Sequence, residues 1–402
     1  MSALLSRTGL LIAMVVALAL PMAPAAADNP RRTPASSETI IRGGTLVALP
    51  PVVQPGTSPA APLNTGQVVA TFEPARLGRV VLLDRKVGAD WRQVARKSQD
   101  AWGSAAFATQ PGTYRARTEN DRGQQVVTGK VVARSWSASF EDTFTAPTLA
   151  SAWSEQVRGR ESVYAPRTCA RTDASAHRVE GGVLKLGVIL DPQLADQRCH
   201  YTSEGVAGEQ SFILTSQIAT ENSYSFTHGI AAARIKPQQA KGMHSGFWLL
   251  PQDVAAFTAG ADPSLGTEMD VMEFFGEAPS GRETIGSHIH HYLSNVESVK
   301  RGGLFRDARL ALSDGADWWD EFHVFSMEWT PEHYIFRVDG REYYRETNDI
   351  SMVNQYLVLS MLASDYELDE LTADELGDTA DVDWVRVWDA TSTSSRKAAR
   401  QR

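Results

Sequence analysis

Short runs of β-forming residues, separated by turn residues, recur along this chain of 402 residues from about residue 66 to residue 388. Helical periodicity is scarce, and strands do not alternate with helices. Such a chain does not form a doubly wound parallel sheet or a β/α-barrel, because both need a helix between successive strands. The sequence therefore predicts an all-β protein, and its length leaves room for two domains.

The strand pattern divides into two parts. Residues 64–135 contain six short runs at spacings near ten residues, with turn signals such as Pro111-Gly112 between them. This rhythm predicts a small β-sandwich and resembles that of immunoglobulin-like accessory modules. Residues 136–391 contain nine clear runs, which predict a large sandwich or barrel.

The two ends of the chain lack this pattern. A basic residue, the apolar run 9–20 and the small residues 25–27 follow one another in the order typical of a secretory signal peptide over residues 1–27. The alternative, a membrane anchor, needs a longer apolar run of about 20 residues. Residues 28–63 are rich in Pro, Ala and Ser and predict a linker, while residues 392–402 predict a disordered tail.

The two cysteines of the chain are Cys169 and Cys199. Export exposes them to an oxidising environment, so we expect them to form a disulfide. By the loop-entropy relation such a bridge stabilises the fold by about 3–4 kcal/mol. The expected location of the mature protein is extracellular.

Charge and missing motifs exclude several classes of function. The net charge is −9, so a nucleic acid is not an expected partner. The motifs G-x-G-x-x-G, H-E-x-x-H and G-x-S-x-G and the P-loop are absent, which disfavours nucleotide enzymes, zincin proteases and lipase-like hydrolases. We expect a monomer with no membrane contact after signal cleavage.

The most informative segment carries three acids in six residues, Glu268, Asp270 and Glu273. On a strand, Glu268 and Asp270 share a face, and one extra residue at Val271-Met272, a β-bulge, brings Glu273 to the same face. Like charges on one face repel, and a solvent-facing strand more cheaply carries Thr, Lys or Gln. The pattern therefore favours chemistry with paired carboxylates, such as glycoside hydrolysis with retention, over a solvated strand face.

Glu268-x-Asp270-x-x-Glu273 resembles the bulged E-x-D-x-x-E signature of glycoside hydrolase family 16, the laminarinase-like group. The resemblance spans about residues 138–390, with the motifs in order. Further matching stretches are residues 215–236, 242–251 (G-M-H-S-G-F-W-L-L-P), 322–340 and 381–388. It implies a concanavalin-like jelly roll with an open sugar cleft, and retaining endo-hydrolysis of a β-linked polysaccharide. By position, Glu268 would be the nucleophile, Asp270 its assistant and Glu273 the acid/base.

The sequence departs from the family at several places near this motif. His244 stands where laminarinases usually carry Trp, and Ser360 where they often carry Asn. Residues 287–291 read S-H-I-H-H, whereas the family often shows H-G-T-x-H, so that Gly286 replaces the first His. The cleft should therefore differ from that of the family near the reacting sugar. The resemblance implies β-1,3-glucan as the substrate, and the departures leave other β-linked polysaccharides such as agar or carrageenan as alternatives. The predicted substrate-binding residues are His244, Trp248, His290, Trp329 and Trp319.

A metal site and two rival functions are also compatible with parts of this sequence. His288, His290 and His291 contain a His-x-His pair that could bind a metal, but spacing assigns no third ligand, so no metal ligand is predicted. The resemblance further implies a structural calcium near Glu141, Asp142 and Asp383, and no required cofactor. A transglycosylase, or a non-catalytic β-glucan-binding protein on the same fold, remain the alternatives.

Overall fold

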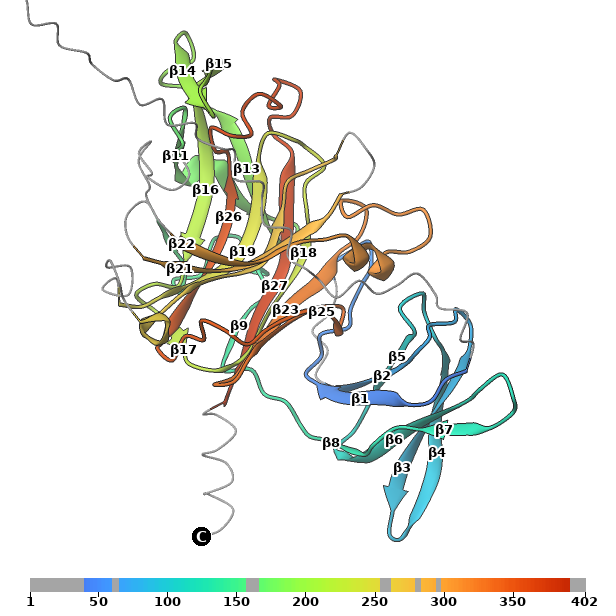
Figure 1. The fold of residues 1–402 in the computed structure, drawn as a ribbon. Coiled ribbons are helices and arrows are strands. Elements are labelled where there is room, and N and C mark those ends of the chain that lie inside the picture. The colour runs from blue at the N-terminus through green and yellow to red at the C-terminus, as the bar shows by residue number, and fades with distance from the viewer. Residues whose placement is uncertain are drawn as a thin grey trace, which may run out of the picture. The chain divides into compact units, whose positions relative to one another are not determined.

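The computed structural model is built almost entirely from strands, as the sequence predicts (Figure 1). It describes residues 40–59, 65–156, 166–253, 262–278, 283–293 and 298–390. The predicted signal peptide over residues 1–27 and the predicted tail over residues 392–402 lie outside this part of the chain. Within it, no helix has the length and apolar character to cross a membrane.

The N-terminal part is a small β-sandwich. One sheet has the order β1-β2-β5 and the other the order β4-β3-β6-β7, with β8 also paired to β6. Val68 and Phe72 of the first sheet pack against Val81 and Tyr114 of the second. An immunoglobulin-like topology stays a prediction. The strands are β1 (Gly44–Leu49), β2 (Gln67–Phe72), β3 (Val80–Val87), β4 (Asp90–Ser98), β5 (Ser104–Ala108), β6 (Gly112–Glu119), β7 (Gln125–Val127) and β8 (Val131–Ala133).

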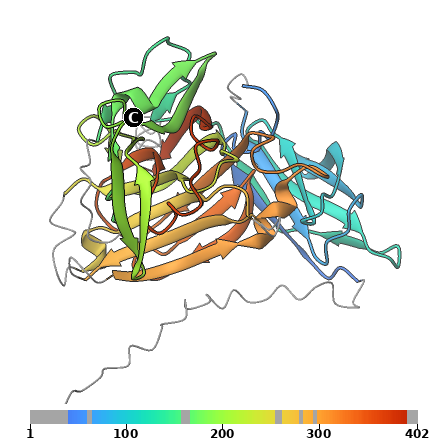
Figure 2. The ribbon, with the colours of Figure 1, turned by 90° about the horizontal axis from the view of Figure 1, so that it is seen from above.

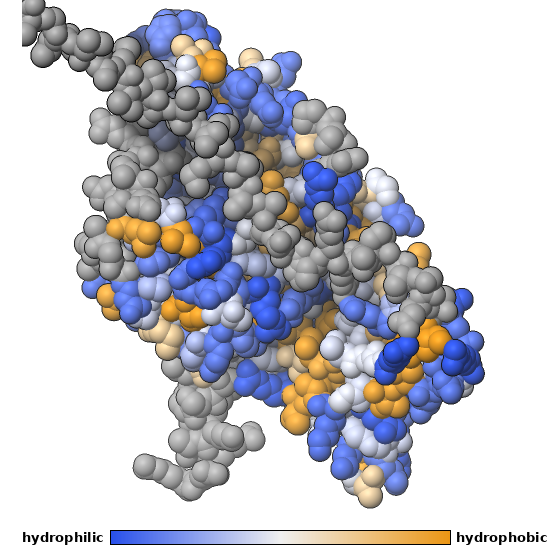
Figure 3. Space-filling view, in the orientation of Figure 1, coloured by the Kyte–Doolittle hydropathy of each residue, from blue (hydrophilic) through white to orange (hydrophobic). Residues whose placement is uncertain are grey.

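The predicted linker over residues 28–63 is wrong for residues 44–49. These residues form β1, which pairs antiparallel with β2 from Gly44↔Phe72 to Leu49↔Gln67. The prolines of the predicted linker lie before residue 44 or after residue 49, so none interrupts this strand. Residues 44–49 alternate between more and less exposed positions, as an edge strand does. Figure 3 shows apolar groups among hydrophilic ones on the surface of this N-terminal part.

The large domain is a jelly roll of two antiparallel layers around one interior (Figure 2). We call the layer that carries the acidic motif the site sheet, with the order β16-β26-β19-β20-β21-β22. Its strands are β16 (Ile213–Ala219), β26 (Gln355–Leu362), β19 (His244–Pro251), β20 (Glu268–Phe274), β21 (Ile285–Tyr292) and β22 (Ser298–Phe305), with β10 (Ser154–Glu155) and β11 (Ala170–Thr172) on β16 and β17 (Ser225–Phe226) on β26.

The second layer, the back sheet, has the order β12-β13-β27-β18-β23-β24-β25, and β9 also pairs with β27. Its strands are β12 (His177–Glu180), β13 (Val183–Leu190), β27 (Thr379–Asp389), β18 (Gly229–Lys236), β23 (His323–Trp329), β24 (Tyr334–Val338), β25 (Arg341–Glu346) and β9 (Phe140–Asp142). Outside the two layers lie the hairpin β14 (Arg198–Ser203) and β15 (Val206–Ser211) and the short 3₁₀ turns η1 (Ala174–Ala176), η3 (Pro263–Leu265) and η4 (Arg306–Ala311).

The core of the jelly roll lies between the two sheets. Met269 and Phe274 of β20 and Phe325 and Phe336 of the back sheet are fully buried in it. Because side chains of a strand alternate between its faces, burying the apolar set of β20 turns its acids to the opposite face.

The predicted disulfide is confirmed. Cys169 and Cys199 are bonded, with a Cα–Cα distance of 5.6 Å. The bond joins the segment before β11 to the hairpin strand β14, across a separation of 30 residues.

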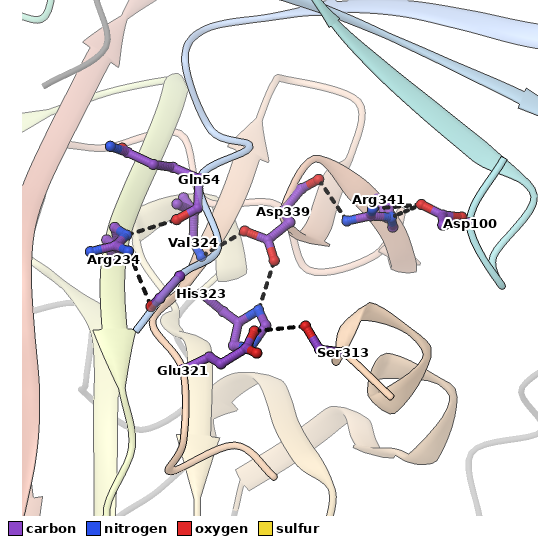
Figure 4. A network of polar contacts seen from close by, with 10 residues as sticks. Gln54, Asp100, Arg234, Ser313, Glu321, His323, Val324, Asp339 and Arg341 are labelled. Carbon is purple, nitrogen blue, oxygen red and sulfur yellow. Dashed lines mark hydrogen bonds and ion pairs between the residues drawn. The ribbon is translucent and has the colours of Figure 1, made fainter. Parts of the chain in front are cut away.

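A network of polar side chains on the back sheet ties the N-terminal segment to the jelly roll (Figure 4). Arg234 of β18 forms an ion pair with Asp383 of β27, with Nη1 and Oδ2 2.6 Å apart. The same guanidinium donates to the carbonyl oxygens of Gln54, at 2.7 Å, and Ser58, at 3.0 Å. A guanidinium that spreads its donors in this way fixes the segment after β1 against the jelly roll.

A second part of this network surrounds Asp339, which is fully buried (Figure 4). Its carboxylate is 2.7 Å from Nδ1 of His323 and accepts the backbone N–H of Val324 at 3.1 Å. Nearby, Nε of Arg341 donates to Asp100 of the N-terminal sandwich at 2.6 Å. Each buried carboxylate here therefore has a donor opposite it.

Candidate active site

The predicted bulge is present in β20. Glu268 pairs with His290 and Asp270 with His288 across β21, but the register then shifts, so that Glu273 pairs with Gly286. The same shift appears on the other side of β20, where it pairs with β19. The bulge adds the one residue needed to turn Glu273 to the face of Glu268 and Asp270.

Each of the three acids has a polar partner from β21. The hydroxyl of Tyr292 donates to Oε2 of Glu268 at 2.9 Å. Nε2 of His290 lies 3.3 Å from Oδ2 of Asp270. Nδ1 of His288 lies 2.6 Å from Oε2 of Glu273. His288, His290 and Tyr292 alternate along β21, so the same period of two that aligns the acids also aligns their partners.

The carboxyl groups differ in the direction of their pKa shifts. Burial, helped by the negative charge of Asp270, raises the pKa of Glu268 to about 7. Burial and the charge of Glu273 likewise raise the pKa of Asp270. Burial also acts to raise the pKa of Glu273, but the hydrogen bond and charge of His288, with the charge of His244, outweigh it and hold this pKa well below its usual range. The free site therefore keeps its negative charge on Glu273.

His244 lies beside the acids but is bound to another carboxylate. Its Nδ1 is 2.7 Å from Oε1 of Glu367, and its ring stacks 6.3 Å from that of Tyr366. Burial disfavours a charged imidazole here, but the charge and hydrogen bond of Glu367 outweigh it and raise the pKa of His244. In place of the expected tryptophan, this chain thus has a buried ion pair.

Trp248 lies on the acid face of the site sheet. It is half-buried, pairs with Asp270 across β20, and donates from Nε1 to Oγ of Ser360 at 3.0 Å. A Cβ on Gly246 would lie 3.2 Å from Cδ1 of Trp248, so glycine leaves the room that the indole uses. Trp248 and His290 are thus placed where a sugar bound to the acids could contact them.

The prediction that Trp329 contacts substrate is wrong, whereas the same call for Trp319 stays a prediction. Trp329 is 1% exposed, packs in the core between the sheets, and donates to the carbonyl of Ser351 at 3.0 Å. Trp319 packs against the core, with its ring centroid 6.4 Å from that of Phe274, whose side chain points away from the acids. Strand parity explains the position of Trp329, which shares the core-facing side of β23 with Phe325 and Met327.

Four residues of the site were not predicted: His288, Tyr292, Glu367 and Lys300. The alternation of β21 could have indicated His288 and Tyr292, since it places both on the face of His290. Glu367 follows β26 in a turn, and no local pattern points to it. Lys300 pairs with His290 from β22, and its charge acts on Asp270 and Glu273.

The acids near the expected structural calcium do not fit a metal ion. Asp383 is paired with Arg234 at 2.6 Å and Glu141 with Arg386 at 2.7 Å. Asp142 accepts from the indole of Trp153 at 2.8 Å. Calcium needs six or more oxygens around one point, whereas two of these carboxylates already face guanidinium groups.

One group of metal-ligating side chains occurs in the part of the chain that the structure describes. Potential ligand atoms of Asp270, His288 and His290 lie within 4.8 Å of one another. The contact of His290 with Asp270 and that of His288 with Glu273 account for both imidazoles. We therefore assign no metal to the site.

Comparison with known proteins agrees with this geometry. Residues 195–386 match the sequence model of Glycosyl hydrolases family 16. A beta-glucanase of Rhodothermus marinus is 29% identical over 173 residues, which cover 43% of this chain and 51% of that protein. A glucan endo-1,3-beta-glucosidase of Cryptopygus antarcticus is 23% identical over 214 residues, or 53% of this chain and 70% of the relative.

Solved structures are similar at lower identity. An endo-beta-1,3-glucanase from Pyrococcus furiosus has a TM-score of 0.48 and 21% identity, over 68% of this chain and 97% of that one. The matched segment spans about half the length of the beta-glucanase from Rhodothermus marinus. The family match includes all three acids of β20 and the strands that pair with it. Over residues 195–386, which are somewhat less than half of the chain, this protein is thus similar in sequence to Glycosyl hydrolases family 16.

Proposed function

We propose that this protein is a retaining endo-glycosidase that hydrolyses internal linkages of β-1,3-glucan. The observation that carries the proposal is the bulge of β20, which gathers Glu268, Asp270 and Glu273 on one face. The match of residues 195–386 to the sequence model of family 16 supports the reaction class. The curated relatives named as a beta-glucanase and a glucan endo-1,3-beta-glucosidase support the substrate.

In this mechanism the two glutamates carry the bond changes. The first step needs the reverse of the charge distribution of the free site, so a proton must pass from Glu268 to Glu273 before the bond breaks. The ionised Glu268 then attacks the anomeric carbon while Glu273 gives that proton to the leaving glycosidic oxygen. A covalent glycosyl-enzyme results. Glu273, now ionised, takes a proton from water, and this water releases the sugar from Glu268 with its original configuration.

Asp270 lies between the two glutamates on the same face. Its raised pKa favours a protonated carboxyl group at this position, which limits the repulsion among three acids. A neutral Asp270 can also donate a hydrogen bond to a neighbouring carboxylate. Its proposed role is therefore to assist Glu268 while the covalent bond between Glu268 and the sugar forms and breaks.

Two rival functions differ in what they require of the acids. A non-catalytic glucan-binding protein has no need for three gathered carboxylates, two of them with raised pKa values. A transglycosylase would use the same residues with a sugar, in place of water, as the acceptor. The family usually carries a tryptophan at the position of His244, which here pairs with Glu367. Because this difference lies beside the acids, the test includes other β-linked polysaccharides.

The test is release of reducing ends from laminarin, lichenan, agar and carrageenan, followed by NMR of the first products. We expect cleavage of laminarin, with the β-anomer appearing first. An initial α-anomer would mean inversion, and longer oligosaccharides in place of new reducing ends would mean transglycosylation. Activity only on agar or carrageenan would replace the proposed substrate but keep the reaction class.

We further infer that the mature protein acts outside the cell as a monomer on a polysaccharide. The N-terminal segment typical of a signal peptide and the disulfide Cys169–Cys199 both support export. Mass spectrometry of the protein recovered from culture medium should show a chain that begins near residue 28, and light scattering should give the mass of a single chain.

A further inference from the structure

Gly286 and His288 form an arrangement around Glu273 that the proposed mechanism does not itself explain. Gly286 pairs directly with Glu273 across the two strands. A Cβ on Gly286 would lie 3.3 Å from Cβ of Glu273 and 3.3 Å from Cε1 of His288. A larger residue at position 286 would therefore crowd the imidazole of His288.

We propose that His288 is a positioning residue for Glu273, which it holds by one carboxylate oxygen in the room that Gly286 provides. The proposal rests on the acid/base role proposed for Glu273. Nδ1 of His288 lies 2.6 Å from Oε2 of Glu273, as a charge-assisted hydrogen bond does. A carboxylate fixed at one oxygen presents the other in a constant direction, where it can meet the leaving group and then the water.

Burial makes this contact rigid. The side chain of His288 is 4% exposed, whereas that of Glu273 is 19% exposed. The imidazole is thus held by its surroundings, while part of the carboxyl group stays open to a ligand. A buried donor that aims at a partly open carboxylate is suited to orient it, because the donor itself has little freedom to move.

The contact also sets the charge of Glu273. The hydrogen bond and charge of His288 lower the pKa of Glu273 against the opposing effect of burial. This favours the ionised form, which the second step needs as a base, over the protonated form, which the first step needs as an acid. Other titratable groups that face the pair are Glu268 and Asp270 of β20, His290 of β21, Lys300 of β22, His244 of β19, Tyr366 and, through His244, Glu367.

The orienting effect can be tested by the dependence on the leaving group. His288→Ala should lower kcat/KM on laminarin about 10–100-fold, because a misplaced acid protonates the sugar oxygen poorly. On a dinitrophenyl glycoside of the β-1,3-linked disaccharide, kcat/KM should fall less than about threefold, because this leaving group needs no proton. An equal loss on both substrates, or no loss on either, would overturn the proposal.

The charge effect can be separated with a second variant. His288→Asn keeps an N–H near the place of Nδ1 but cannot carry a charge. Because the loss of the cation raises the pKa of Glu273, and because Glu273 must enter the reaction protonated, the alkaline limb of kcat/KM should move about one unit to higher pH. An unchanged profile would contradict the role of His288. His200→Ala, which alters an exposed histidine of β14, is the matched control and should change neither readout.

A double-variant cycle tests the part assigned to Gly286. Gly286→Ala alone should lower kcat/KM on laminarin about tenfold, because its Cβ crowds both Glu273 and His288. In the His288→Ala background the same change should cost clearly less than about tenfold, because the imidazole is gone and only the contact with Cβ of Glu273 remains. Additive losses would show that the two positions act independently and would overturn this part of the proposal.

The outcomes separate this inference from the proposed function. Thermal unfolding of each variant shows that it is folded before its rate is compared. A folded wild-type protein that cleaves no polysaccharide of the panel would overturn the proposed function and this role together. An active wild type whose His288 variants lose activity equally on both substrates would overturn the positioning role alone.

Discussion

Two buried polar regions of this protein differ in how their carboxylates are paired with donors. On the back sheet, Arg234 lies against Asp383. His323 likewise lies against Asp339 (Figure 4), so each carboxylate faces a donor. On the site sheet, the bulge of β20 brings three carboxylates to one face. Among these, only Glu273 is matched by an imidazole strongly enough for its pKa to fall.

The difference shows what each region is built for. A one-to-one pair balances the cost of burying charge and joins parts of the chain that are far apart in sequence. Carboxylates that lie close together repel one another, so some of them stay protonated and their pKa values differ. Such a group is suited to proton transfer in catalysis. The comparison therefore predicts that changes at the two regions alter different properties of the protein.

The largest effect is expected for Glu268→Ala, which removes the proposed nucleophile. Hydrolysis of laminarin should fall at least about 10³-fold, because no covalent intermediate can form. The melting temperature should stay the same or rise, since a buried acid next to like charges is removed. Glu342→Ala, on the exposed strand β25, is the control and should keep full activity. Near-native hydrolysis by Glu268→Ala would contradict the assignment of this protein as a glycoside hydrolase.

Arg234→Met should show the reverse pattern. It takes the guanidinium from a buried pair and from the carbonyls of Gln54 and Ser58. We expect the free energy of unfolding to fall by about 3–5 kcal/mol, measured by urea denaturation. The kcat of the folded protein should not change. If activity falls while stability is kept, the two regions are not separate in function.

Asp270→Asn tests the comparison through the pH dependence of the reaction. Whenever Asp270 is ionised, its charge raises the pKa of Glu268. Asparagine cannot ionise, so the substitution should lower that pKa. Because Glu268 must be ionised to attack, the acid limb of the kcat/KM profile should then move to lower pH, and the rate at the optimum should fall about tenfold. Asp383→Asn, the matched change on the back sheet, should leave the profile in place.

The smallest effect is expected for Trp248→Ala. The indole is half-buried on the acid face and is held by Ser360 at 3.0 Å. Its loss should raise KM for laminarin about threefold to tenfold, which is up to about 1.4 kcal/mol of binding, with little change in kcat. A fall in kcat with an unchanged KM would mean that Trp248 supports the acids and does not bind sugar.

Much of the site could be predicted because its signal is local. The three acids and their bulge lie within six residues, and the alternation of side chains along a strand follows from backbone geometry alone. The disulfide also follows from simple counting, since Cys169 and Cys199 have no other candidates. Local patterns failed at residues 44–49, where composition suggested a linker although the segment pairs as β1.

The sequence by itself therefore determined the all-β class, the acidic motif and the bond between the cysteines. Only the tertiary structure decided the neighbours of the acids: His288 on Glu273, Glu367 on His244, and Trp329 in the core in place of a sugar contact. The physical reason is that alternation tells which residues share a face, but not which face is buried or which residue of the next strand stands opposite. Register and layer packing settle both, and they depend on contacts between distant parts of the chain.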